Sequence, residues 1–128
     1  MRILALDAGE ARCGCAVCDP TETVVTPLQS VSRPDTKRGL DTLARLVRER
    51  EIEQVVVGLP LTMRGEEGEQ AQWSRRFAEA LAARVSVPVV MHDERLTTRQ
   101  AERSGGTADA DSRAAAHLLE AFLMARAG

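Results

Sequence analysis

The pattern of hydrophobic and polar residues predicts that short strands come first in this chain and that strands alternate with helices afterwards. Three β-prone runs are separated by turn residues such as Asp19-Pro20, and they should pair as an antiparallel meander. A later run around Val55-Val56-Val57 is apolar throughout, which is typical of a strand buried on both faces of a parallel sheet. Strands are therefore predicted at residues 2–6, 12–18, 23–31, 52–58 and 88–91.

Apolar residues that recur every three or four positions predict helices between and after these strands. The first helix should directly follow Asp35, which is placed to cap it. Its inner face should carry Leu40, Leu43, Leu46 and Val47, and that of the second helix Ala71, Phe77, Ala78 and Leu81. The helices after the first are predicted at about residues 69–84, 97–103 and 111–126.

This order of elements predicts an α/β fold with a five-stranded mixed β-sheet and helices on both faces. Residues 1–128 contain no internal repeat, low-complexity tract or linker, so we expect one domain. With 128 residues, of which 44% are hydrophobic and 28% charged, the chain can bury a core without disulfides or structural metal. Intrinsic disorder is excluded as the main interpretation.

The net charge of -2 does not indicate a nucleic-acid-binding protein, so any basic surface must be local. Lys37 is the only lysine, and the remaining basic residues are arginines, which bind phosphates and carboxylates through two parallel hydrogen bonds. Trp73, Phe77 and Phe122 are the only aromatic residues, which argues against recognition of stacked bases on an aromatic surface. The apolar runs are too short for a signal peptide or a membrane span, so we expect a cytoplasmic protein.

Three cysteines, Cys13, Cys15 and Cys18, form a C-x-C-x-x-C pattern that could indicate metal or redox chemistry. The count is odd and no second Cys/His cluster accompanies it, which makes a poor tetrahedral metal site. We expect them to be buried, reduced thiols that pack as small hydrophobic side chains.

Carboxylates follow the predicted strands at the positions where α/β sheets bind ligands. Asp7 comes after the first strand and Asp93-Glu94 after the last, so in parallel strands these acids would share one edge of the sheet. Asp111 begins the sheet-facing stripe of the last helix, although an acid there is also common as a cap or as a partner of the helix dipole. Carboxylates from three separate elements are the arrangement that holds Mg²⁺ or Mn²⁺ against phosphate oxygens, and their mutual repulsion predicts metal dependence.

Two arginines lie within a few residues of these acids. Arg12 and Arg95 could each contact a phosphodiester, although either could also be a solvated surface residue. The two histidines do not add a catalytic group: His117 is interpreted as a packing or surface residue, and His92 stands alone at the end of a strand. The sequence has no Walker-type glycine loop and no convincing serine or cysteine nucleophile with a partner.

Motifs along essentially the whole chain resemble those of the YqgF/RuvX family. They appear in collinear order as Asp7-Ala8-Gly9 with Arg12 and Gly14, Gly58-Leu59-Pro60-Leu61, Met63-Arg64-Gly65 with Gly68, Asp93-Glu94-Arg95-Leu96-Thr97-Thr98 with Ala101-Glu102, and Asp111-Ser112 before Ala114-Ala115. The resemblance implies a ribonuclease-H-like fold, the group that also holds Holliday junction resolvases. It further implies that Asp7, Glu94 and Asp111 bind a divalent metal for phosphodiester hydrolysis, with Asp93 as an acid in reserve.

Three functions follow from this resemblance as alternatives. The protein could mature the 5′ end of the 16S rRNA precursor, resolve four-way DNA junctions, or bind RNA as a ribosome-assembly factor without cutting it. A phosphate-binding fold related to sugar kinases is disfavoured, because those proteins need two lobes. The sequence leaves open whether the protein is a monomer or a homodimer, although a junction resolvase must place two active sites across a two-fold substrate.

Overall fold

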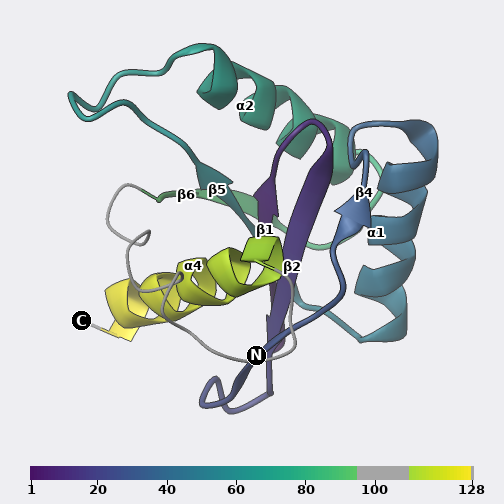
Figure 1. Ribbon diagram of the computed structural model, residues 1–128. Helices are drawn as coiled ribbons and strands as arrows, with labels where there is room; N and C mark the ends of the chain where they lie inside the picture. The colour runs from purple at the N-terminus through teal and green to yellow at the C-terminus, as the bar shows by residue number, and fades with distance from the viewer. Residues whose placement is uncertain (95–109, 128) are drawn as a thin grey trace.

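Three adjacent parallel strands form one side of a mixed sheet, and helices cover both of its faces (Figure 1). The computed structural model describes residues 1–94 and 110–127. Its elements are β1 (Ile3–Ala8), β2 (Arg12–Cys18), β3 (Val25–Pro27), β4 (Val31–Ser32), α1 (Lys37–Glu49), β5 (Gln54–Leu59), α2 (Glu69–Ala82), β6 (Val89–Asp93) and α4 (Ala110–Ala127). The strand order is β3-β2-β1-β5-β6, with β4 paired to β2. This arrangement confirms the predicted α/β class and mixed sheet.

Alternate residues of β1 supply two separate hydrophobic cores, as the period of a strand requires. Leu4 and Leu6 pack with the inner faces of α1 and α2, whereas Ile3 and Ala5 pack with Leu118 and other residues of α4. The predicted inner face of α2 is buried in full, and that of α1 is buried except for Leu46, which is half-buried. Val55, Val56 and Val57 are fully buried, as a central strand with helices on both faces requires.

The third predicted strand is divided into β3 and β4, so the sheet has six strands, five of them in one continuous order. Pro27 pairs with Ala16 and Val31 pairs with Cys13, so three residues at 28–30 lie opposite two on β2. The extra residue is a β-bulge, which bends the chain away from the ladder. The bend is reflected in the hydrogen bonds, because the Leu28 amide still donates to the Cys15 carbonyl before the pairing resumes at β4.

Three of the boundaries that differ from the predictions bear on the acids or on the cap of α1. β1 continues to Ala8 because its antiparallel ladder with β2 runs to the pair Ala8 and Cys13, so Asp7 lies inside the strand rather than after it. β6 likewise extends to Asp93, which pairs with Leu59. The cap of α1 is Thr36 and not Asp35, because the Thr36 hydroxyl accepts a hydrogen bond from the Gly39 amide at 3.1 Å.

The three cysteines are free and buried, which confirms their interpretation as packing residues. The hydrogen bond with Cys15 and burial raise the pKa of the Cys13 thiol well above its usual value, so this thiol stays neutral. The helix predicted at 97–103 lies outside the described residues. None of the helices in the described part of the chain is long and apolar enough to cross a membrane.

Candidate active site

The carboxyl ends of the parallel strands bring Asp7 and Glu94 into contact. β1, β5 and β6 run parallel, so Asp7 near the end of β1 and Glu94 just after β6 lie at the same edge of the sheet. The Glu94 amide donates to the Leu59 carbonyl at 3.3 Å, which fixes where the chain leaves β6. The Asp7 and Glu94 side chains share a hydrogen bond. The structure therefore joins two of the three acids that the sequence singled out.

Glycine at position 58 makes this contact sterically possible. β5 lies between β1 and β6, so the Glu94 side chain has to cross β5 to reach Asp7. It crosses at Gly58, where an added Cβ would overlap Glu94 Oε2 and approach Leu118 Cδ2 to 3.3 Å. The sequence motif contains Gly58, but only the strand order shows that this residue is needed for the passage of the Glu94 side chain.

Asp111 reaches the same edge from the other layer of the molecule. It lies in the first turn of α4, and that turn packs directly on β2 beside Gly14, the partner of Asp7 in the β1–β2 ladder. A Cβ on residue 14 would overlap the Asp111 carbonyl group. The contact is fixed further by Ser112, whose buried hydroxyl accepts a hydrogen bond from the Cys15 amide at 3.1 Å. Asp111 is close enough for its charge to raise the pKa of Asp7.

Replacing Gly14 with alanine should therefore destabilise the protein. The added methyl group meets backbone atoms of α4, including the Ser112 amide nitrogen at 2.8 Å, and backbone cannot rotate away as a side chain can. Overpacking of this kind costs about 1–3 kcal/mol. Urea denaturation should show that decrease in stability in Gly14→Ala but not in Gly9→Ala, where the nearest atom would be 3.5 Å from the new Cβ. Equal stability of the two variants would contradict this packing.

Arg12 lies at the rim of the acidic edge. Its Nε is 3.2 Å from Asp111 Oδ2, and its side chain is 69% exposed. Because most of the guanidinium faces solvent, this ion pair contributes little stability and leaves donors available for a phosphate. Arg95, the second arginine predicted to contact nucleic acid, lies outside the described residues.

The protonation of the two contacting acids reflects burial and like charge. Burial first, and then the charge of Asp7, raise the pKa of Glu94 to about 7. The pKa of Asp7 is also raised, mainly by burial and by the charge of Asp111, while the hydrogen bond from Glu94 opposes that rise. Glu94 therefore holds the shared proton and donates to the Asp7 carboxylate. Asp93 ends β6 and adds a further negative charge next to Glu94.

The chemistry of this donor set fits a divalent cation. Mg²⁺ and Mn²⁺ prefer carboxylate oxygens, and a cation would remove the repulsion that the proton on Glu94 and the guanidinium of Arg12 now relieve. Within 1–94 and 110–127, the structure contains no group of three His, Cys, Asp or Glu side chains arranged to hold a metal ion. Asp7, Glu94 and Asp111 could hold a cation only with Glu94 deprotonated and with the ion pair between Asp111 and Arg12 broken.

Both histidines contact neighbouring side chains, and packing is the expectation for His117. The ring of His92 meets that of Phe122 edge-on at 5.5 Å between centroids. His117 Nδ1 lies 3.2 Å from Glu120 Oε1 on the same helix. Neither of these contacts belongs to the acidic edge.

Comparison with known families and relatives identifies close similarity along nearly the whole chain. The family model described as "RuvX: Holliday junction resolvase" matches residues 1–125. A Chloroflexus aurantiacus protein named "Putative pre-16S rRNA nuclease" is 44% identical, over 97% of this chain and 87% of the relative. A Listeria monocytogenes protein of the same name is 38% identical, over 96% of this chain and 97% of the relative.

Solved structures support the fold at much lower sequence identity. RuvC from T. thermophilus in complex with a Holliday junction substrate superposes with a TM-score of 0.69 and 17% identity, covering 100% of this chain and 97% of that one. The fowlpox virus Holliday junction resolvase superposes with a TM-score of 0.54 and 12% identity over the full length of both chains. The likeness to RuvC confirms the predicted ribonuclease-H-like fold.

Proposed function

This chain belongs to the RuvX family, and we propose that it is a divalent-metal-dependent nuclease that hydrolyses phosphodiester bonds in 5′-end maturation of the 16S rRNA precursor. The observation that carries the proposal is the contact of Asp7 with Glu94 at the carboxyl edge of the sheet, with Asp111 beside them. Full-length relatives named for pre-16S rRNA nuclease activity support RNA as the substrate. Such an enzyme would act in the cytoplasm.

Each acid has a defined part in this proposal. Asp7, Glu94 and Asp111 would hold Mg²⁺ or Mn²⁺, and Asp93 would stand in reserve next to Glu94. A bound divalent ion supplies activation of water and stabilisation of charge on the phosphate oxygens. Glu94 would hold the cation in its deprotonated form, and in its protonated form it donates a hydrogen bond to the Asp7 carboxylate. Arg12 and Arg95 would contact phosphates of the nucleic acid, and a phosphate bound to Arg12 would compete with its ion pair to Asp111.

A second function is favoured by the description of the family model. Resolution of a four-way DNA junction would use the same acids, but it would require a homodimer that presents two sites to a two-fold substrate. A monomer would favour RNA processing. The third alternative, an RNA-binding assembly factor, would use the same surface without turnover.

Cleavage of matched substrates separates these three functions. Labelled RNA that covers the 5′ end of the precursor and a synthetic four-way DNA junction are incubated with the protein and Mg²⁺ or Mn²⁺, and the mass of the protein is measured by light scattering. The proposal predicts that the RNA is cut and the junction is bound weakly or left intact. Cutting of the junction by a dimer would replace rRNA processing with junction resolution. Binding of the RNA without cleavage in either ion would replace it with a role in ribosome assembly.

The raised pKa of Glu94 predicts a pH-dependent stability when metal is absent. Folding favours the protonated form of this acid, whose pKa rises from 4.5 to about 7, so folded protein binds more protons than unfolded protein across that window. In EDTA, the Tm should fall as the pH rises from about 4.5 to 7. Glu94→Gln, which cannot ionise, should flatten this part of the Tm profile.

Added Mg²⁺ should restore stability where Glu94 is ionised. A ligand that binds only the folded protein raises its stability, and the deprotonated site binds the cation best. The Tm gained on adding Mg²⁺ should therefore be larger at pH 8 than at pH 6. A profile in EDTA that is identical for wild type and Glu94→Gln would show that Glu94 is not the group that titrates.

A further inference from the structure

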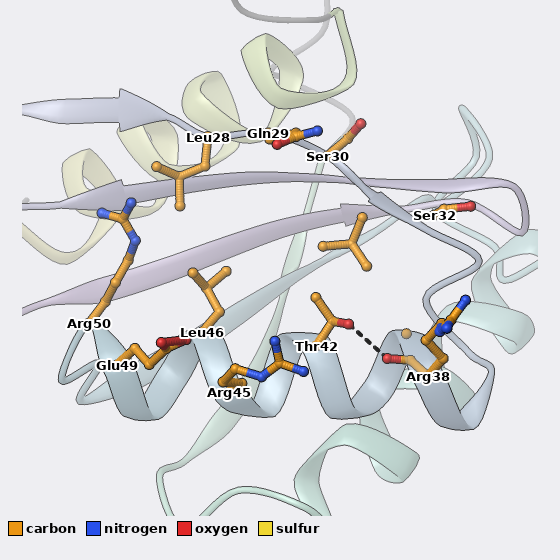
Figure 2. Close-up of a pocket in the computed structure, with 12 residues that line it drawn as sticks. Leu28, Gln29, Ser30, Ser32, Arg38, Thr42, Arg45, Leu46, Glu49 and Arg50 are labelled. Atoms are coloured by element: carbon orange, nitrogen blue, oxygen red, sulfur yellow. Dashed lines mark hydrogen bonds between the residues drawn. The ribbon is translucent and has the colours of Figure 1, made fainter.

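A groove with a basic lining runs between α1 and the bulged segment that joins β3 to β4 (Figure 2). Its volume is about 490 Å³. Leu28, Val31 and Leu46 contribute apolar lining, whereas Ser32, Thr42 and Gln29 contribute polar groups. Three arginines and one glutamate complete the charged lining: Arg38, Arg45, Arg50 and Glu49. The groove thus carries a local positive charge on a protein whose net charge is -2.

These arginines form no ion pair with the part of the chain that the structure describes. Within residues 1–94 and 110–127, no carboxylate forms a salt bridge with Arg38, Arg45 or Arg50. Asp41, on the exposed side of the same helix, pairs instead with Arg84, which follows α2. The groove therefore offers guanidinium groups whose hydrogen-bond donors face solvent and are available to an anion.

Two features of the chain next to the groove are unfavourable for folding and involve basic residues. Lys37 and Arg38 occupy the first turn of α1, which has no acidic residue, although cations oppose the helix dipole there. Arg33 has a φ of 44°, a left-handed conformation that costs a residue other than glycine of order 1 kcal/mol. A protein with an acid at position 37 and a glycine at position 33 would be more stable, so stability alone does not account for the basic residues there.

The groove and the acidic edge lie on opposite faces of the sheet and are linked through the paired strands β4 and β2. Ser32, which lines the groove, pairs with Arg12 in the ladder between β4 and β2. Arg12 in turn contacts Asp111. The Arg33 amide donates to the Ala11 carbonyl at 2.9 Å, which holds the start of the α1 connection against the β1–β2 turn. A strand bound at the acidic edge would therefore have to turn around the β4 side of the sheet, past Arg12 and Ser32, to reach α1.

We propose that this groove binds the phosphate backbone of the RNA outside the cleaved bond. This proposal rests on the proposed function, because the RNA is the substrate of that nuclease. Arg38 and Arg45 lie on one face of α1, seven residues or roughly 10 Å apart along the axis, so they contact different phosphates. Thr42 lies between them and donates its hydroxyl proton to the Arg38 carbonyl at 2.8 Å. Its oxygen lone pair is left to accept a hydrogen bond from a ribose 2′-hydroxyl, a donor that DNA lacks.

A matched pair of substitutions on one helix tests this groove. Arg45→Gln and Arg48→Gln remove the same charge three residues apart, but Arg48 does not line the groove. Binding of labelled precursor RNA is measured by fluorescence anisotropy in EDTA, where no cleavage occurs, over a series of salt concentrations. We expect Arg45→Gln to raise the Kd about 3- to 10-fold and Arg48→Gln to leave it unchanged.

The double variant Arg38→Gln/Arg45→Gln gives the number of phosphates involved. Removal of one arginine–phosphate interaction should reduce the slope of log K against log salt by about 0.7 for a single strand, so the double variant should show a slope smaller by about 1.4. Thermal melting checks that the variants fold, because all the substituted side chains are exposed. An equal rise of the Kd in Arg45→Gln and Arg48→Gln, or an unchanged slope in the double variant, would overturn the proposal.

Binding and cleavage fail separately in this design. If the RNA is bound through the groove but never cut with Mg²⁺ or Mn²⁺, the nuclease function is wrong and the groove assignment stands. If the RNA is cut while the double variant binds as wild type does, the groove assignment alone is wrong. A DNA strand of the same sequence that binds as tightly, with the same decrease of slope in the double variant, would overturn the assignment to RNA.

Discussion

Asp7→Asn should abolish metal-dependent cleavage while leaving the protein folded. Asp7 contacts Glu94 and lies within the electrostatic reach of Asp111, so it is the acid through which the other two are connected. Asparagine has almost the same shape and can still accept the hydrogen bond from Glu94, but it removes the charge that a cation requires. We expect kcat/KM to fall by about 10³-fold or more.

The same substitution should not reduce stability. It removes a half-buried carboxylate that is crowded by Asp111, so the Tm at pH 8 in EDTA should be unchanged or higher. Asp35→Asn provides the control, because Asp35 is exposed and lies outside the acidic edge. Cleavage by a well-folded Asp7→Asn protein at the wild-type rate would remove Asp7 from the active site.

Gly58→Ala should produce a second large decrease in activity, although it replaces no charged residue. The new methyl group would occupy the space of Glu94 Oε2, and the carboxylate is the far end of a flexible side chain, so it moves while the backbone stays. A displacement of about 1 Å in a catalytic group can cost about 10²-fold. We expect kcat/KM to fall by about 10²-fold, with a Tm within a few degrees of wild type.

Gly68→Ala is the matched control for this experiment. It makes the same change in backbone entropy, but no atom lies within 4 Å of the new Cβ, and its φ of -88° suits alanine. Its cleavage rate should stay within about two-fold of wild type. In Gly58→Ala the pKa of Glu94 should also fall, because Glu94 would move away from Asp7. Equal activity of the two variants would show that Glu94 does not need to cross β5.

Much of the acidic edge can be predicted from the sequence because strand ends are strong local signals. A run of apolar residues that stops at an acid places that acid at an edge, and parallel strands bring such edges together. This pattern locates Asp7 and Glu94, and the apolar stripe of α4 locates Asp111. The two cores are equally predictable, because the periods of strands and helices specify which side chains are buried.

The parts that cannot be predicted depend on neighbours that are distant in the sequence. Gly58 is required only because β5 lies between the strands that carry Asp7 and Glu94, and the order of strands is not a local property. The pairing of Arg12 with Asp111 joins residues from β2 and α4. The bulge at 28–30 arises because β3 and β4 pair with β2 in registers that differ by one residue.

The basic groove is invisible in the sequence for the same kind of reason. The pattern of α1 alone places Arg45, Arg48 and Arg50 on the outer face of a helix, which is the usual role of such residues. The bend at the bulge places Leu28 and Ser32 beside that helix and converts part of its outer face into one wall of a groove. A charge pattern on a single helix cannot show this, since the second wall comes from another element.

Single-turnover cleavage of one labelled precursor RNA by the wild-type protein tests the central claim most directly. The RNA is incubated with excess protein in three parallel reactions: with Mg²⁺, with EDTA, and with EDTA followed by an excess of Mg²⁺. The product is measured over time in each. A site formed by Asp7, Glu94 and Asp111 predicts cleavage in Mg²⁺, none in EDTA and full recovery when Mg²⁺ returns. Cleavage at the same rate in EDTA, or bound RNA that is never cut under any of these conditions, would contradict it.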